Sequence, residues 1–200
     1  CFVTSARLRR IVKDYPEVQV DHHAFALAPE PNSIARMFGG PARGKTEIMG
    51  HWQAAAAHPD GEPINVELMR SREFPYPYSM PGLLACKAAQ FQGGMPAHWD
   101  MFDRIQRAHA VEARNIADVA VLKSCAADVG LDVERWEADF NSEAVRKAVQ
   151  VELDEDNQMG INAVPTLVFN HKWMLSGAVP EASLRQIIEN LLAGRDPSAR

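Results

Sequence analysis

The first thirty residues alternate apolar and polar positions in two different ways. Over residues 1–15, apolar side chains recur every three or four positions and basic side chains fill the gaps. This spacing predicts an amphipathic helix, which Pro16 ends. Residues 18–27 are rich in valine, alanine and other apolar residues and predict a strand, which stops at the prolines of residues 28–31.

The middle of the chain has a helical pattern. Residues 32–80 read as irregular, with Gly39-Gly40-Pro41 as a breaker and one predicted helix at Gly44–Ala57. Beyond residue 81, apolar positions keep a helical period up to about residue 158, and N-capping residues and glycines mark the helix ends. The expected helices cover residues 83–91, 99–113, 119–129, 133–140 and 142–158.

The pattern changes again near the C-terminus. Thr166–Asn170 and Lys172–Ser176 read as two short strands joined by a tight turn, and an amphipathic helix follows Pro180 up to Leu192. Neither the first thirty residues nor the last forty can form a stable sheet alone. Together they can, so we expect one domain from residues 1–30 and 160–194, with 31–159 as a helical insertion.

This order of elements predicts an α/β fold with a large all-helical insertion. One strand before Cys1 is missing from the pattern. Because the sequence starts without an initiator methionine, we expect the native N-terminus to be missing or processed.

The composition of the chain argues against several classes of function. The net charge is −5, which argues against the basic face that nucleic acid or an anionic membrane would need. No apolar run reaches transmembrane length, and no signal peptide is visible. Three cysteines in 200 residues are too few for a disulfide scaffold, so we expect one reactive thiol, two packed thiols and a cytoplasmic location.

Cys1 is the candidate reactive residue. It lies at the start of the first predicted helix, where the helix dipole and free amide groups favour a thiolate. Arg7 and its neighbours add positive charge nearby. The competing interpretation is that Cys1 only marks where the sequence begins.

The other candidate chemistry is weaker. Cys125 lies on an apolar helix face and Cys86 follows Leu83-Leu84-Ala85, so both are expected to be packed. The seven histidines show no zinc-ligand spacing, and we expect no metal. The acidic run of residues 152–156 and the aromatic residues between 74 and 102 are expected to form a solvated helix face and part of the core, respectively.

Val164-Pro165 opens the first C-terminal strand. Proline cannot donate a ladder hydrogen bond, but it is tolerated at the start of a strand, and an X-Pro bond can be cis at low cost. The position of this proline before two short strands and a terminal helix is informative, because domains of a known class of thiol proteins have the same arrangement at their C-terminal end.

The residues that carry this resemblance lie along most of the chain. Gly160–Phe169 resembles the Gly-Val-x-Gly-Val-Pro-x-Phe-Val-Phe motif of the DsbA-like thioredoxin superfamily, particularly its FrnE-type oxidoreductases. Cys1-Phe2-Val3 with its basic helix resembles the end of that family's Cys-Pro-Trp-Cys-(Phe/Tyr) site. Ala113–Asp118, Val129–Asp132 and Ser176–Ala178 resemble further family segments.

The resemblance implies a thioredoxin-like fold and thiol–disulfide exchange on proteins or small thiols, without a bound cofactor. It implies that Cys1 is the second, resolving cysteine, that Val164 and Pro165 bind substrate beside it, and that glutathione is a possible co-substrate. A homodimer is also possible in this superfamily. The first cysteine of the motif is not in this sequence, and Asn162-Ala163 replaces the usual residue-Gly step.

Three other functions compete with disulfide exchange. One is a glutathione-dependent isomerase or transferase on the same fold, which typically has serine in place of the first cysteine. A second is a non-catalytic thioredoxin-like binding module. The third is an N-terminal-nucleophile hydrolase that uses the amine of Cys1, and the helix-rich middle argues against it.

Overall fold

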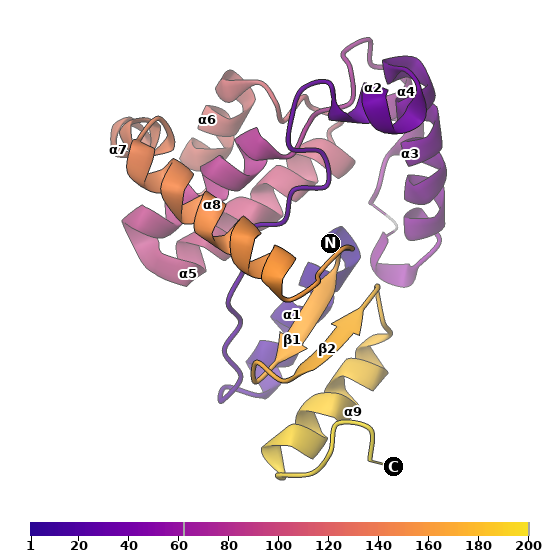
Figure 1. Cartoon of the computed structure of the whole chain (residues 1–200), viewed down its shortest axis with the longest axis vertical. Coiled ribbons are helices and arrows are strands. Elements are labelled where there is room, and N and C mark those ends of the chain that lie inside the picture. Colours follow the sequence, from indigo (N-terminus) through magenta and orange to yellow (C-terminus); the bar gives the residue numbers. More distant parts are fainter. Residues whose placement is uncertain (62, 200) are drawn as a thin grey trace. The chain divides into compact units, whose positions relative to one another are not determined.

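The computed structural model describes residues 1–61 and 63–199, and the chain divides into two compact units (Figure 1). The first unit joins both ends of the chain: Cys1, residues 3–20 and the described residues from Ile161 onward. The second unit holds Phe2 and residues 21–160.

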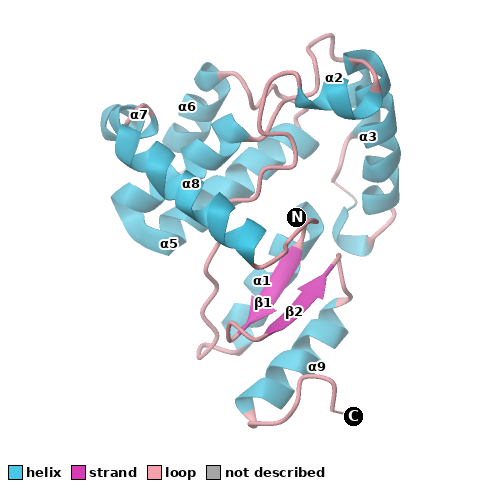
Figure 2. Ribbon diagram, in the orientation of Figure 1, coloured by secondary structure: helices cyan, strands magenta, loops and turns pink. Residues whose placement is uncertain are grey.

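The first unit contains two helices and a hairpin. Helix α1 (Phe2–Asp14) comes from the N-terminal segment, and β1 (Thr166–Phe169), β2 (Trp173–Ser176) and α9 (Glu181–Leu192) come from the C-terminal segment. The two strands are antiparallel, with Thr166 opposite Ser176 and Phe169 opposite Trp173 (Figure 2). The predicted strands, their order and the final helix are therefore confirmed.

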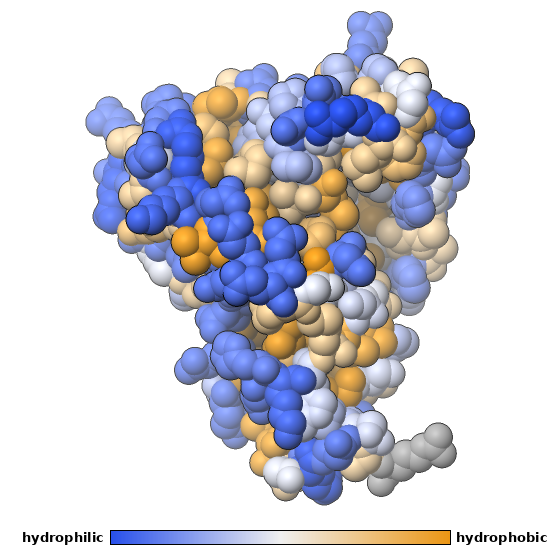
Figure 3. Space-filling view, in the orientation of Figure 1, coloured by the Kyte–Doolittle hydropathy of each residue, from blue (hydrophilic) through white to orange (hydrophobic). Residues whose placement is uncertain are grey.

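The alternation of side chains along the hairpin decides which face is covered. Leu167, Phe169 and Leu175 share one face and pack against Ile11 of α1 and against α9. Val168 and Met174 pair on the opposite face and stay exposed. Apolar side chains are visible over the hairpin in Figure 3. One apolar face thus binds both helices, although they are more than 160 residues apart in sequence.

In the described residues of the second unit, all regular secondary structure is helical. Its core contains Trp136, whose indole Nε1 donates to the carbonyl of Ala85 at 3.1 Å and whose ring stacks on Phe140. Asp118, Asp132 and Ser142 cap three of the helices through their side chains, as expected for N-cap residues. The elements are α2 (Ser33–Phe38), α3 (Pro41–Ala56), a short 3₁₀ turn (Pro59–Gly61), α4 (Val66–Ser71), α5 (Met80–Ala110), α6 (Val119–Asp128), α7 (Val133–Phe140) and α8 (Glu143–Gln158).

Helix α5 covers both of the helices expected at residues 83–91 and 99–113. Its backbone leaves the helical region at Gly93 and Gly94, and Gly94 has φ of +68° and ψ of −162°. Only glycine adopts such a conformation readily, and Pro96 follows it. The long element is therefore two helical segments separated by a glycine break, as the sequence pattern indicates.

The predicted strand at residues 18–27 is wrong. In the described residues the sheet contains only β1 and β2, and residues 18–27 run as irregular chain. Their amides bind side chains of the helical unit instead: the amide of His22 donates to Met95 Sδ and that of Ala24 to a Glu152 carboxylate oxygen. An apolar pattern indicates burial, but it does not supply a neighbouring strand.

Residues 32–80 are more regular than expected. Besides the predicted helix, which forms as α3, this segment contains the short helices α2 and α4. Both are six residues long, so their sequences show less than two turns of periodicity. In the described residues, no helix has the length and apolarity that crossing a bilayer requires.

Candidate functional site

Cys1 is the N-cap residue of α1. It is exposed, whereas the two other cysteines of the chain are buried. Its carbonyl accepts the first helical hydrogen bond, from the amide of Ser5 at 2.9 Å, and its side chain makes no capping hydrogen bond. A thiol at this position meets the positive end of the helix dipole and remains accessible to a reactant.

The Val164–Pro165 peptide bond is cis and leads directly into β1. The carbonyl of Pro165 accepts a hydrogen bond from the amide of Gly177 at 2.8 Å, which extends the hairpin pairing by one step. In the described part of the chain, neither the amide nor the carbonyl of Val164 has a hydrogen-bond partner. These groups can therefore pair with an added extended chain.

Contacts between α1 and α9 place Cys1 and Pro165 at the same end of the first unit. Arg10 bonds Glu181, Asp14 pairs with Arg185, and Tyr15 bonds Glu189, so the two helices run side by side in the same direction. The start of α1 therefore lies toward the start of α9. The chain enters α9 from Gly177, which is bonded to Pro165, so the thiol and the proline segment belong to one end.

Cys86 and Cys125 are packed in the same apolar cluster of the second unit, as the sequence predicts. Burial raises the pKa of Cys86 to about 12 and also raises the pKa of Cys125. Both thiols therefore stay protonated near neutral pH, and neither is a good nucleophile. Among the described cysteines, Cys1 is the accessible one.

Two histidines of the second unit are held neutral. Burial, with smaller effects from the charges of His22 and Lys87, lowers the pKa of His98 to about 3. Burial lowers the pKa of His109 to about 4, and its ring contacts Tyr76 Oη at 3.0 Å. The described residues contain no cluster of three or more histidine, cysteine or acidic side chains that could hold a metal ion.

The acidic run at the end of α8 is not a purely solvated face. Glu152 forms an ion pair with Lys87, whose side chain is only 3% exposed, and also accepts the amide of Ala24 at 2.9 Å. Asp156 is buried as well, and burial raises its pKa. The expectation of a solvated face holds for Asp154 and Glu155, which are exposed.

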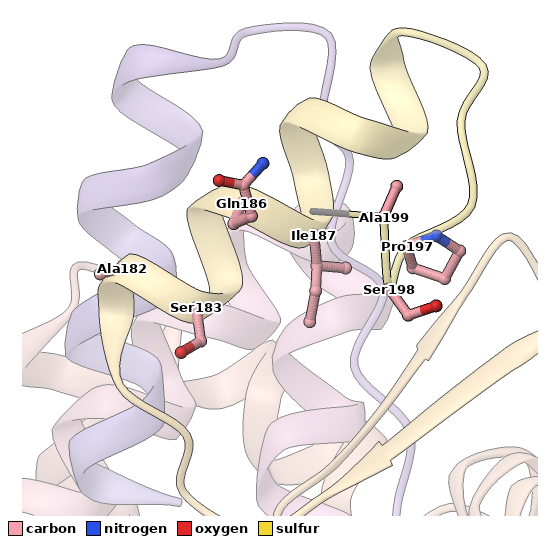
Figure 4. A pocket seen from close by; sticks show the side chains of 7 residues that line it. All are labelled: Ala182, Ser183, Gln186, Ile187, Pro197, Ser198 and Ala199. Carbon is pink, nitrogen blue, oxygen red and sulfur yellow. The ribbon is translucent and has the colours of Figure 1, made fainter.

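The aromatic residues between positions 74 and 102 are mainly core. Phe74 and Tyr76 pack in one cluster of the helical unit, and Phe102 packs against the other. In the first unit, a shallow hollow lies between α9 and the C-terminal tail (Figure 4). None of its described lining residues is an acid, a base or a thiol, so it offers no redox chemistry. They are Ala182, Ser183, Gln186, Ile187, Pro197, Ser198 and Ala199.

A thiol at a helix N-terminus, at the same end of its unit as a proline-led hairpin, suggests a particular group of proteins. A family model described as thioredoxin matches residues 35–178. The chain belongs to this thioredoxin family. The match spans most of the helical unit as well as the hairpin.

A curated relative of this thioredoxin-family chain carries a different functional name. It is the ClpXP adapter protein SpxH of Shouchella clausii, 30% identical over 165 residues, which cover 74% of this chain and 54% of the relative. The chain thus spans about half the length of this relative. Other SpxH proteins, including that of Bacillus subtilis at 34% identity over 86 residues, match shorter stretches.

Solved structures share the fold over nearly the whole chain. A candidate protein disulfide isomerase from Nitrosomonas europaea has a TM-score of 0.77 at 19% identity, covering 97% of this chain and 92% of its own. The cytosolic disulfide reductase DsbM from Pseudomonas aeruginosa has a TM-score of 0.72 at 23% identity, covering 96% and 93%. The fold is therefore the DsbA-like thioredoxin fold with a helical insertion that the sequence predicts.

Proposed function

We propose that this chain is a thiol–disulfide oxidoreductase of the DsbA/FrnE type, with Cys1 as its reacting thiol and the Val164–Pro165 segment as its substrate-binding edge. One observation carries the proposal. The exposed thiol stands at the N-terminus of α1, at the same end of its unit as a proline-led strand whose Val164 amide and carbonyl are without partners in the described residues.

Residues 1–200 contain Cys1, the cysteine that the resemblance makes the resolving one, but not the first cysteine of the motif, so the exchange is written for Cys1 and a second, added thiol. The Cys1 thiolate attacks one sulfur of a substrate disulfide, the S–S bond breaks, and the other half leaves as a thiolate that takes a proton from water. A mixed disulfide on Cys1 results. A small thiolate such as that of glutathione then attacks one sulfur of this mixed disulfide. Attack on the substrate sulfur joins glutathione to the substrate and releases the Cys1 thiolate, whereas attack on the Cys1 sulfur joins glutathione to Cys1 and releases the substrate thiolate.

Two comparisons support this assignment. The superfamily fold is the one on which the disulfide reductase DsbM is built, and DsbM has also been solved with GSH. In the proposed site, the open backbone groups of Val164 would hold an extended peptide or the peptide part of a small thiol by strand addition. The substrate class is therefore a protein or peptide disulfide, with a small thiol as the second reactant.

Replacing Cys1 tests the proposal. The reduced chain should form a mixed disulfide with an aromatic disulfide such as DTNB and release one thiolate, followed by its absorbance. Cys1→Ser should slow this reaction roughly 100-fold or more, because the nucleophile is gone. Cys86→Ala and Cys125→Ala should leave it close to the original rate, since both thiols are buried and protonated. Equal rates in the original chain and Cys1→Ser would refute the proposal.

An adapter function is the second candidate, and the SpxH relatives are the observation that favours it. An adapter binds its client and needs no thiol chemistry. It therefore predicts that Cys1→Ser keeps full client binding and that the original chain shows no exchange with peptide disulfides. A Cys1-dependent turnover of glutathione and a peptide disulfide would favour the oxidoreductase.

A further inference from the structure

Arg7 is the one arginine of α1 that is buried in the described structure, with only 4% of its surface exposed. Arginine is rarely buried without a specific partner, because removing its charge from water is costly. The guanidinium of Arg7 donates through Nη1 to the backbone carbonyl of Val179 at 2.5 Å. Arg7 is therefore built into the first unit and differs from Arg10, which is exposed on the same helix.

The partner carbonyl belongs to a short run of backbone hydrogen bonds. The amide of Val179 bonds to the carbonyl of Gly177 at 3.1 Å, and the amide of Gly177 bonds to the carbonyl of Pro165 at 2.8 Å. Three consecutive hydrogen bonds thus connect the Arg7 side chain with the proline that opens β1. The connecting residues 177–179 belong to no helix or strand, and the side chain of Val179 packs against the apolar cluster that contains Ile11 and Leu184.

The same side chain is attached to the helix that begins with Cys1. Arg7 lies six residues after Cys1, which corresponds to about 9 Å along a helix axis. Because α1 is a continuous helix from Phe2 to Asp14 and Cys1 is its N-cap residue, a shift or rotation of the helix at Arg7 also moves Cys1. Arg7 is therefore linked to both parts of the proposed site, to the thiol through α1 and to the proline segment through Gly177.

We infer that Arg7 is a positioning residue that holds the Val164–Pro165 edge in register with the Cys1 helix. This inference rests on the proposed function and adds a residue to it. Arg7 acts through the backbone of residues 177–179 rather than on the reacting sulfur. Arg7 therefore affects the reaction of a peptide disulfide, which must bind along the Val164 edge and reach the Cys1 thiol at the same time. It has little effect on the reaction of a small disulfide, which contacts only the thiol.

Substitution of Arg7 separates these two substrate types. Arg7→Met removes the donor while keeping a long apolar side chain, and Arg7→Lys keeps one donor for the carbonyl of Val179. We expect Arg7→Met to lower kcat/KM for a peptide disulfide roughly tenfold, because a misplaced binding edge weakens alignment, and to change the rate with DTNB by less than about twofold. Arg7→Lys should recover most of the loss.

Backbone amide exchange gives a readout that does not depend on activity. Exchange at the Gly177 amide, which is bonded to Pro165, should become roughly tenfold faster in Arg7→Met if the connection is lost. The matched control is Lys13→Gln, which removes a positive charge from an exposed position of the same helix. It should leave both the substrate ratio and the Gly177 exchange rate unchanged.

The outcomes distinguish this inference from the proposed function. If the original chain exchanges disulfides through Cys1 but Arg7→Met keeps the original ratio of peptide to DTNB rates, Arg7 is not a positioning residue. An equal change in Lys13→Gln would also overturn the inference, because the loss of any positive charge from α1 would then explain it. Absence of any Cys1-dependent exchange in the original chain would refute the proposed function, and with it this role of Arg7.

Discussion

Lys87 and Glu152 form an ion pair that is largely buried in the helical unit. Lys87 is 3% exposed and Glu152 15% exposed, so both charges are largely removed from water. Lys87 also donates to Gln90 Oε1 at 2.7 Å, and Glu152 accepts the amide of Ala24 at 2.9 Å. Each charge therefore depends on its partner, and the bond from the Ala24 amide attaches that residue to the pair.

Removing one charge of this pair should lower the free energy of unfolding more than removing both charges. Glu152→Gln leaves the Lys87 ammonium buried without a counter-charge and should lower the free energy of unfolding by about 3–5 kcal/mol. Adding Lys87→Met should restore part of that loss, while the amide side chain introduced by Glu152→Gln can still accept the Ala24 amide. Urea denaturation of the single and double variants measures both effects.

An exposed pair supplies the control. Lys123 and Glu137 are in contact at 2.6 Å, but their side chains are 43% and 42% exposed. Glu137→Gln should therefore cost less than about 1 kcal/mol. If the double variant Lys87→Met/Glu152→Gln were less stable than Glu152→Gln alone, the charge of Lys87 would not be the cause of the loss.

The sequence reveals side chains with distinctive chemistry more readily than side chains that only position other groups. Cys1 and Pro165 attract attention because of their chemistry and their place next to predicted elements. Arg7 is noticed only as positive charge near Cys1, because it stands among Arg9, Arg10 and Lys13 and resembles any basic residue on the polar side of a helix. Its burial depends on residues 177–179, which lie at the other end of the chain, so no local pattern could reveal it.

At the scale of elements, the hairpin turn has an unusual backbone. Asn170 and His171 have φ of +50° and +55°, which is left-handed conformation. Asparagine tolerates this region better than most residues, whereas histidine is less favourable there than glycine. The turn links β1 to β2 and so fixes the register in which Leu167 and Leu175 reach the core.

Glycine in the turn should stabilise the hairpin. His171→Gly relieves the left-handed conformation and should raise the free energy of unfolding by up to about 1 kcal/mol, offset in part by the greater freedom of glycine in the unfolded chain. His171→Val should lower it by about 1–2 kcal/mol. Thermal denaturation of both variants checks the order, and a more stable valine variant would contradict it.

The elements themselves were predictable where periodicity is long. The helices after residue 81, the hairpin and α9 follow from apolar spacing and capping residues. The strand expected at residues 18–27 failed, because a strand needs a partner and these amides bind Met95 and Glu152 side chains instead. The glycine break in α5 is visible in the sequence as Gly93-Gly94, but its geometry is not.

For the molecule as a whole, the buried histidines predict sensitivity to acid. His98 and His109 have pKa values near 3 and 4 in the folded chain, against an ordinary value of 6.5. Between about pH 6.5 and 4 the unfolded chain therefore binds more protons than the folded one. Within this window, protonation of each histidine in the unfolded chain should lower the free energy of unfolding by up to about 1.4 kcal/mol for each unit by which the pH decreases.

Replacing one histidine tests this response. His109→Gln can still accept the Tyr76 hydroxyl, and its urea midpoint should fall less between about pH 7 and pH 5 than that of the original chain. Gln53→Ala, at an exposed position of α3, removes no titratable group and should show the original pH dependence. Identical pH slopes for His109→Gln and the original chain would rule out His109 as a source of the acid response.

The first unit is assembled from the two ends of the chain, and this has a consequence for the order of events during synthesis. Arg7 and Val179 are separated by 172 positions. A ribosome adds roughly 5–20 residues each second, so α1 emerges roughly 10–30 s before β1, β2 and α9. Until then its apolar face has no hairpin to cover it. A stop codon before β1 would therefore leave α1 without the hairpin and the helix that cover its apolar face.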